Sequence, residues 1–386
     1  MIPSGFIYLD HAATSFPKPE VVYQAVDKAL REECGNPGRS NHRLALSATR
    51  VVEEARMLCA RLFHAPSPDS IVFTNNTTTA LNMSIRGSVS PGEHVITSSL
   101  EHNSVTRPLN YLADSGGEVT KIPTDLHTGL SLTALEQAVQ KNTKLVVCTH
   151  ISNATGTVND IAAIGEFCQR KGILFLVDGA QSAGMRPIDV QKMEIDLFAF
   201  PGHKGLLGPQ GTGGLYIRPQ VELTTILQGG TGNHSESLDQ PHSSPERYES
   251  GTLNIPGLAG LAAGVRYLLD VGISAVAKHE QELTTRLLKG IAQISGITLF
   301  GPDETVERGN VVSIRFDHIS VAEAALMMDA AFSIAVRGGL HCSADAHRTM
   351  GTLENGGTLR ISPGYLNTIE EIEQCLEALA ICAKGV

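Results

Sequence analysis

The sequence lacks the features that would place this 386-residue chain in a membrane or on a nucleic acid. No stretch approaches the roughly 18 uninterrupted apolar residues of a membrane-spanning helix. No basic block stands out in a chain whose formal net charge is −10. The first residues, MIPSGFIYLDHAATS, have neither a basic start nor a long apolar core, so we expect no secretory signal. These absences favour a cytoplasmic protein with no membrane and no nucleic-acid partner.

Cysteine is sparse, and its seven copies are an odd number scattered along the chain. Without a secretory signal, this pattern indicates free thiols in a reducing compartment instead of a disulfide framework. Five of the cysteines lie in apolar or helical patterns and are typical of small core residues: Cys59, Cys148, Cys168, Cys375 and Cys382. Cys342 has a different setting, which is described below.

The dominant rhythm of the first 256 residues is strand, turn, helix. Short apolar, β-rich runs occupy residues 70–74, 94–99, 144–150, 173–181, 196–204 and 213–218. Helix-period segments lie between many of them, at 80–88, 131–140 and 161–172, the last ended by Gly172. Buried strands alternating with helices predict an α/β domain with a mostly parallel sheet flanked by helices. Ligands of such sheets bind beyond the carboxyl ends of the strands.

The order of expected helices and strands changes near residue 257, and we expect a smaller α+β domain over 257–386. Its helix-rich start at 258–294 is followed by a strand at 311–316, a helix at 321–331, β-rich runs at 333–342 and 357–365, and a last amphipathic helix at 368–384. The N-terminal segment, about residues 1–15, is expected to pack with this small domain. The polar, Gly/Ser/Pro-rich segment 228–254 reads as a functional loop or lid.

One lysine lies in an unusual sequence context, FAFPGHKGLLGPQGTGGLYI, from Phe198 to Ile217. Lys204 follows an expected strand end and precedes a glycine-rich stretch. A solvated loop lysine is the plain interpretation of that context alone. Asp178, however, ends an apolar strand, where a carboxylate is costly to bury without a cationic partner. NNTTTALN (75–82) places hydroxyls and backbone N–H groups at a helix start, which is a natural anion site, and His102 supplies a flat ring.

These groups together match the needs of pyridoxal 5′-phosphate. A lysine holds the cofactor covalently, an acid keeps the ring nitrogen protonated, and a helix start takes the phosphate. The glycines of 205–214 also suggest a nucleotide-binding module. They precede a strand instead of opening a helix, which is the wrong order for a dinucleotide fingerprint.

At this point the sequence resembles the class V aminotransferase family of fold-type I pyridoxal phosphate enzymes, and within it the cysteine desulfurases and selenocysteine lyases. The resemblance covers nearly the whole chain, and it rests on the order and spacing of motifs that are weak singly. These are YLDHAATS (8–15), NPGRSNHRLALSATRVVEEAR (36–56), TTTALN (77–82), EHNS (101–104), SNATGT (152–157), VDGAQS (177–182), GHKGLLGPQGTGGLYIR (202–218), YESGTLN (248–254), RGGLHC (337–342) and LRISPGYLNT (359–368).

The resemblance implies a role for each matching residue. Lys204 would hold the cofactor, Asp178 would pair with the pyridine nitrogen and Gln181 with the ring oxygen. His102 would stack on the ring, and Asn153 would lie near ring and substrate. The phosphate would be bound by His203, Thr77 and Thr78, and by Thr252 reaching across a dimer interface. Arg360 would clamp the substrate α-carboxylate, a task that suits a bidentate guanidinium.

The sequence departs from the family pattern at the phosphate site. Pro201 stands where a serine or threonine is usual, which removes a hydroxyl and an N–H. Asn76 replaces a glycine, and Thr79 replaces a glutamate. Because Asn tolerates positive φ, we expect the turn to survive. The cofactor is expected to bind with altered phosphate contacts.

The segment AVRGGLHCSADAHR (335–348) bears on the reaction. A structural loop cysteine is one interpretation of Cys342. A metal site of His341, Cys342 and His347 is another, although its spacing does not match the usual Cys/His metal patterns, and we expect no metal. The third is a nucleophile whose thiol pKa His341 and Arg337 could lower; both are also candidate substrate-binding residues. The Arg-x-Gly-x-His-Cys pattern resembles that of desulfurases with a short cysteine loop.

The function implied is a cysteine desulfurase that converts L-cysteine to L-alanine, with Lys204, Cys342 and His102 as catalytic residues. Sulfur would pass to Cys342 as a persulfide and then to an acceptor protein, as in iron–sulfur cluster assembly. L-Selenocysteine could follow the same path, and a homodimer is expected. The alternatives are a selenocysteine lyase, aminotransferase or epimerase of the same family in which Cys342 is not essential. A catalytically inactive family member is a further alternative, which Pro201 keeps open. The evidence against it is the presence of Lys204, Asp178, His102, Cys342 and Arg360.

Overall fold

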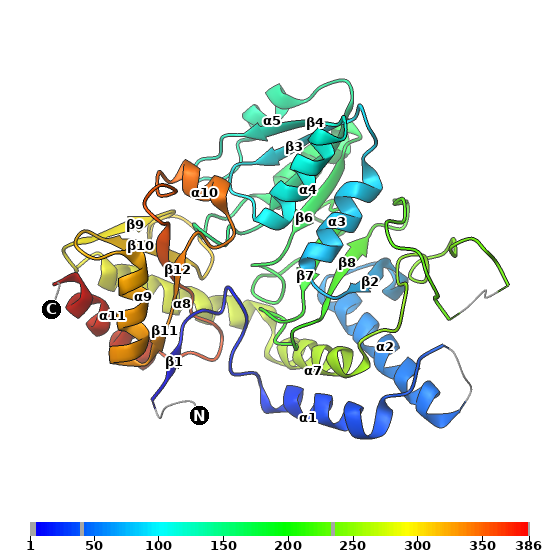
Figure 1. The fold of residues 1–386 in the computed structure, drawn as a ribbon, viewed down its shortest axis with the longest axis horizontal. Helices are drawn as coiled ribbons and strands as arrows, with labels where there is room; N and C mark the ends of the chain where they lie inside the picture. Colours follow the sequence, from blue (N-terminus) through cyan, green and yellow to red (C-terminus); the bar gives the residue numbers. More distant parts are fainter. Residues whose placement is uncertain (1–4, 39–41, 233–235, 385–386) are drawn as a thin grey trace.

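The computed structural model describes residues 5–38, 42–232 and 236–384. The motif at 36–56 and the loop at 228–254 therefore each contain three residues outside the described ranges. A seven-stranded sheet forms the centre of the larger part of the molecule (Figure 1). Its spatial order is β2 (Ile71–Thr74), β8 (Gly213–Ile217), β7 (Leu197–Pro201), β6 (Leu174–Asp178), β5 (Thr143–Thr149), β3 (His94–Ser98) and β4 (Glu118–Ile122). Only β8 runs antiparallel to its neighbours, so the predicted mostly parallel sheet is confirmed.

The apolar runs in the sequence identify six of the seven strands. The strand that they do not identify, β4, lies at the sheet edge and mixes polar and apolar residues as EVTKI. The three predicted helices are present as α3 (Thr77–Ser88), α5 (Leu132–Ala138) and α6 (Ile161–Lys171). Gly172 ends α6 in the left-handed conformation, at φ 67°, as expected of a glycine C-cap. The other helices of this part are α1 (Glu20–Lys28) with a π-helical extension at Ala29–Glu33, α2 (Arg43–Leu62) and α4 (Asn103–Asp114).

The C-terminal part contains a four-stranded antiparallel sheet. Its order is β12 (Arg337–Gly339), β13 (Thr358–Ile361), β10 (Val312–Phe316) and β9 (Ile297–Phe300). The sheet packs with α8 (Ile273–Ile291), α9 (Val321–Phe332) and α11 (Ile369–Ala383) through one apolar core. A short helix, α10 (Ala344–Thr349), follows the cysteine loop. The N-terminal strand β1 (Ile7–Tyr8) pairs in parallel with β11 (Ile334–Ala335), and the blue ribbon of β1 lies against the C-terminal part in Figure 1.

Core packing bears on the predicted boundary at residue 257. Helix α7 (Ile255–Val271) places Leu258, Leu261 and Val265 in the core that covers one face of the large sheet, together with residues of α2. Ile7 and Leu9, in contrast, belong to the core of the C-terminal part. Thus α7 packs with the large domain, and the N-terminal segment packs with the small one. The two-domain division itself stays a prediction.

Among the described residues, no single helix is both long and apolar enough to cross a membrane. Only α7 and α8 taken together meet the criteria of length and composition, and they are bent by 84° at Gly272. The large sheet positions the site, because β5, β6 and β7 end at one edge where the first turns of α3 and α4 also lie.

Candidate active site

A cavity of about 210 Å³ opens at the carboxyl ends of the central strands. It is lined by eleven of the thirteen predicted site residues: Thr77, Thr78, His102, Asn153, Asp178, Gln181, His203, Lys204, Arg337, His341 and Arg360. Cys342 lies beside this cavity without lining it, and Thr252 lies outside it. The tertiary structure thus gathers into one site residues that span nearly 300 positions of sequence.

Lys204 follows β7 and has its amine in the cavity. Burial lowers the pKa of Lys204 to about 8, and nearby Arg360 and Arg337 act in the same direction, while Asp178 opposes them. A lysine amine is nucleophilic only when it is neutral, so this environment prepares Lys204 for covalent chemistry.

The N-terminal segment anchors the backbone next to Lys204. The carbonyl oxygen of His203 accepts hydrogen bonds from Ser15 N at 2.9 Å, Thr14 Oγ1 at 3.0 Å and Ser15 Oγ at 3.1 Å. Thr14 Oγ1 also lies 3.1 Å from His203 Nδ1. Burial, Lys204 and Lys18 lower the pKa of His203 to about 4, so its ring is neutral at physiological pH. These bonds tie the N-terminal segment to the residue that precedes Lys204.

Asp178 is the last residue of β6 and is 2% exposed. Its Oδ1 accepts a hydrogen bond from Ala180 N at 2.9 Å. Burial raises the pKa of this carboxyl, although the Ala180 bond and Lys204 oppose the rise. A carboxyl buried in this way stabilises a cationic partner placed in the cavity. Gln181, three residues on, donates from Nε2 to the Ala12 carbonyl at 2.9 Å, and its buried Oε1 has no hydrogen-bond partner.

The anion site lies at the N-terminus of α3. Asn76 is the N-cap, and its Oδ1 accepts from Thr79 N at 2.9 Å. The turn is present as expected, but for a different reason: Asn76 has φ −175°, which is extended backbone, and its side chain stabilises the turn by capping. Thr77 lines the cavity, and its buried Oγ1 has no hydrogen-bond partner among the described residues. An unpartnered hydroxyl at a helix N-terminus suits an incoming phosphate.

His102 is the N-cap of α4, and its Nδ1 accepts a hydrogen bond from Ser104 N at 3.0 Å. The ring proton therefore resides on Nε2. Ser104 Oγ also links His102 Nδ1, at 2.9 Å, to Thr78 Oγ1, at 2.7 Å. Burial lowers the pKa of His102 to about 4, with Lys204 and three arginines acting in the same direction. A neutral, fixed imidazole suits stacking on a flat ring.

Two arginines bring positive charge into the cavity. Arg337 and Arg360 are directly opposed residues on the antiparallel strands β12 and β13. Arg360 is 1% exposed, and its Nη2 pairs with Asp10 Oδ1 at 2.6 Å while Nη1 donates to the Asn153 carbonyl at 3.1 Å. Like charges placed directly opposite each other are unfavourable without a counter-ion. Asp10 neutralises one of the two guanidinium charges, so the pair keeps a positive charge that suits an anion such as a carboxylate.

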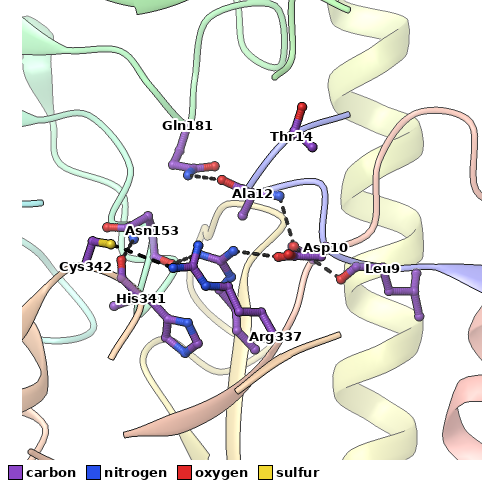
Figure 2. A network of polar contacts seen from close by, with 12 residues as sticks. Leu9, Asp10, Ala12, Thr14, Asn153, Gln181, Arg337, His341 and Cys342 are labelled. Carbon is purple, nitrogen blue, oxygen red and sulfur yellow. Dashed lines mark hydrogen bonds and ion pairs between the residues drawn. The ribbon is translucent and has the colours of Figure 1, made fainter. Parts of the chain in front are cut away.

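Cys342 is exposed, and Arg337 Nη2 lies 3.7 Å from its Sγ (Figure 2). His341 lies in the cavity wall, but its Nε2 contacts Thr358 O and Oγ1, each at 3.0 Å. Burial and neighbouring arginines lower the pKa of His341 to about 2, so the ring carries no charge. The prediction that His341 helps to ionise the thiol was therefore wrong, since a neutral ring supplies no positive charge. Only Arg337 of the two places a cation beside Cys342.

Thr252 is exposed, just before α7, and it does not reach the cavity of its own chain. Its loop is anchored three residues earlier by Glu249. This carboxylate accepts from Arg56 Nη1 and Nη2, each at 2.8 Å, and from Phe73 N at 2.6 Å. The role predicted for Thr252 requires a second chain and stays a prediction.

Several residues with structural contacts to the site were not predicted from the sequence. Asp10, Thr14, Ser104 and Ser343 contact Arg360, His203, His102 and Asn153 respectively. Asp10, Thr14 and Ser104 lie inside the motifs YLDHAATS and EHNS, so position in a motif was the available signal. No group of three or more His, Cys, Asp and Glu side chains in the described ranges is placed to hold a metal ion.

Comparison with known proteins identifies the relationship. The family model described as aminotransferase class-V matches residues 7–375. The chain belongs to the class-V aminotransferase family. A probable cysteine desulfurase of Methanothermobacter thermautotrophicus is 38% identical over 97% of this chain and 94% of its own. The cysteine desulfurase IscS of Serratia proteamaculans is 32% identical over 96% of this chain and 91% of its own.

Solved structures agree. The apo structure of the cysteine desulfurase from Thermococcus onnurineus NA1 covers 99% of this chain and 95% of its own, with a TM-score of 0.92 and 34% identity. The cysteine desulfurase CsdA of Escherichia coli, in an S-sulfonic acid form, covers 99% of this chain and 96% of its own, with a TM-score of 0.89 and 29% identity. The predicted family and the fold-type I architecture are thereby confirmed.

Members of this family use pyridoxal 5′-phosphate, and the residues here fit that cofactor. The fit rests on the buried Thr77 hydroxyl, which has no partner among the described residues, on the buried Asp178 carboxyl in the same cavity lining and on the lowered pKa of Lys204. Pro201 ends β7 opposite Gly213, and the hydroxyls of Thr77, Thr78 and Ser104 remain in the cavity wall. The site thus keeps hydroxyl groups for the phosphate despite Pro201, and the expected change in phosphate contacts stays a prediction.

Proposed function

We propose that this protein is a pyridoxal phosphate-dependent cysteine desulfurase. The observation that carries the proposal is the exposed Cys342, whose Sγ lies 3.7 Å from Arg337 Nη2, beside the cavity that Arg337 and Lys204 line. The close relatives named cysteine desulfurase support it. A transaminating enzyme needs no cysteine at this place.

The residues divide the reaction among them. Lys204 would hold the cofactor and, as a neutral amine, take the α-proton of L-cysteine. Arg360 would bind the substrate carboxylate, oriented by Asp10 and the Asn153 carbonyl. Asp178 would stabilise the protonated ring nitrogen, and the bound cofactor would supply the electron sink for the carbanion.

The sulfur atom passes directly from the substrate to Cys342, while the bound cofactor would delocalise the electron pair that the cleavage leaves on the substrate. The Cys342 thiolate forms an S–S bond to the substrate sulfur as the substrate Cβ–S bond breaks, and its electron pair stays on Cβ. Protonation of Cβ completes the methyl group of L-alanine. L-Cysteine and one thiol thereby give L-alanine and one persulfide, whose outer sulfur is the oxidised product. An acceptor then takes that sulfur.

A homodimer belongs to this proposal, because Thr252 is exposed on an anchored loop and has no role in its own cavity. We also propose a cytoplasmic location and a role in supplying sulfur for iron–sulfur cluster assembly. Both rest on the expected free thiols and on the named relatives.

The test follows one sample through the reaction. L-Cysteine is added to the purified holoenzyme while the cofactor absorbance is recorded and L-alanine and Cys342 persulfide are measured. We expect the absorbance to shift and both products to form in equal amounts in the first turnover. Cys342→Ala should retain the absorbance shift but form no persulfide. If Cys342→Ala released alanine and sulfide at the wild-type rate, a family member that does not need Cys342 would be the better assignment.

A further inference from the structure

The loop that carries Cys342 has a strained backbone. His341 and Cys342 have φ 49° and 57°, so two consecutive residues with side chains occupy the left-handed region. This region is unfavourable for residues other than glycine, and such conformations persist only where the surroundings over-determine them. The question is therefore what holds this loop.

Three short hydrogen bonds tie the loop to the wall of the cavity. Asn103 N, at the start of α4, donates to the Cys342 carbonyl at 2.7 Å. Asn153 Nδ2 donates to the His341 carbonyl at 2.7 Å, and Ser343 Oγ donates to Asn153 Oδ1 at 2.7 Å. Both ends of the Asn153 amide thus face the loop, and Figure 2 shows this side chain next to Cys342.

The same asparagine connects the loop to the substrate site. The Asn153 carbonyl accepts from Arg360 Nη1 at 3.1 Å, so one residue contacts both the cysteine loop and the predicted carboxylate clamp. Asn153 is 7% exposed, and Ser343 is fully buried. Neither amide oxygen nor hydroxyl has ready access to water that could replace the bond between them.

We propose that Asn153 and Ser343 are positioning residues that clamp the cysteine loop in its strained conformation and hold the Cys342 thiol beside Arg337. This inference rests on the proposed function, because it assigns the clamp to persulfide formation. It predicts that loss of the Ser343 bond affects sulfur transfer after L-cysteine has bound, and not the binding of cofactor or substrate.

Ser343→Ala tests the clamp in the holoenzyme, because it removes the bond to Asn153 while leaving every cavity-lining side chain in place. We expect hydrogen exchange of the peptide over residues 337–349 to become about two- to tenfold faster, the range for one lost hydrogen bond. Under the same reasoning kcat should fall about two- to tenfold while KM for L-cysteine and the cofactor absorbance stay unchanged.

Two further variants keep the test sharp. Asn153→Ala removes both side-chain bonds and should accelerate exchange of the 337–349 peptide at least as much as Ser343→Ala. Ser84→Ala is the matched control, because Ser84 is also fully buried but its hydroxyl bonds only Ala80 O within α3. It should leave exchange in 337–349 and kcat unchanged.

Unchanged exchange of residues 337–349 in both loop variants would overturn the clamp. So would faster exchange accompanied by a wild-type kcat. The proposed function fails separately, if the wild-type enzyme makes neither alanine nor persulfide. In that case the exchange measurement still decides whether the loop is clamped.

Discussion

The buried ion pair between Arg56 and Glu249 offers a direct test of how burial governs the strength of a salt bridge. The two side chains are 8% and 6% exposed, and they are joined by two bonds of 2.8 Å. Arg31 and Asp27 have the same chemistry, with bonds of 2.8 and 2.9 Å, but their side chains are 73% and 61% exposed. The two pairs differ in solvent access, and the buried pair has two further bonds, from Phe73 N to Glu249 and from Arg56 to the Ile71 carbonyl.

Removing the charge of Glu249 leaves the Arg56 guanidinium buried without its counter-ion. We expect Glu249→Gln to lower the free energy of unfolding by about 3–5 kcal/mol, the cost of breaking a buried pair from one side. Asp27→Asn should leave it nearly unchanged, because water solvates both partners and screens their attraction. Urea unfolding of the holoenzyme, at fixed protein and cofactor concentrations, measures both variants.

The double variant Arg56→Met/Glu249→Met separates charge from packing. Since it leaves no buried charge, it should recover part of the loss seen in Glu249→Gln, although Phe73 N loses its acceptor. Equal losses in Glu249→Gln and Asp27→Asn would refute the reasoning. A double variant less stable than Glu249→Gln would also refute it, because packing would then outweigh charge.

Three further outcomes follow from the structure. Because the pKa of Lys204 is about 8, its neutral fraction rises from about 1% at pH 6 to about 50% at pH 8. The rate at which cofactor is incorporated into the cofactor-free protein, followed by absorbance, should rise in the same way. A rate that does not change with pH would contradict the assignment of Lys204 as the cofactor-binding lysine. Burial raises the pKa of Glu280 to about 8, so the folded state binds an extra proton between the unfolded pKa near 4.5 and pH 8. The protein therefore loses stability as pH rises through that window. Glu280→Gln should show a smaller drop in urea midpoint from pH 5.5 to pH 8 than the wild type, and an identical drop would argue against a role for Glu280. Thr14→Val removes the hydroxyl bonds to His203 and should weaken cofactor binding about two- to tenfold in an absorbance titration. Unaltered affinity would show that the N-terminal segment does not position the Lys204 loop.

The sequence alone determined the strands and helices whose signal is local. Buried parallel strands such as β5 and β6 are continuous apolar runs, and Gly172 ends its helix by its own conformational freedom. The search for apolar runs did not detect strand β4, because β4 lies at an edge of the sheet, where its polar side chains can reach water. The residues that line the cavity were also predictable, since their motifs place them at strand ends and helix starts.

Only the tertiary structure decided how those residues are paired and charged. Asp10 contacts Arg360 across 350 positions of sequence, and no local pattern specifies such a partner. His341 was predicted to aid the thiol, but burial beside two arginines makes it neutral and Thr358 engages its ring. Motifs indicate which residue types the chemistry needs, because a motif is a pattern of residues that are close together in the sequence. Protonation states and partners depend on burial and on distances between remote segments, and these exist only once the chain has folded.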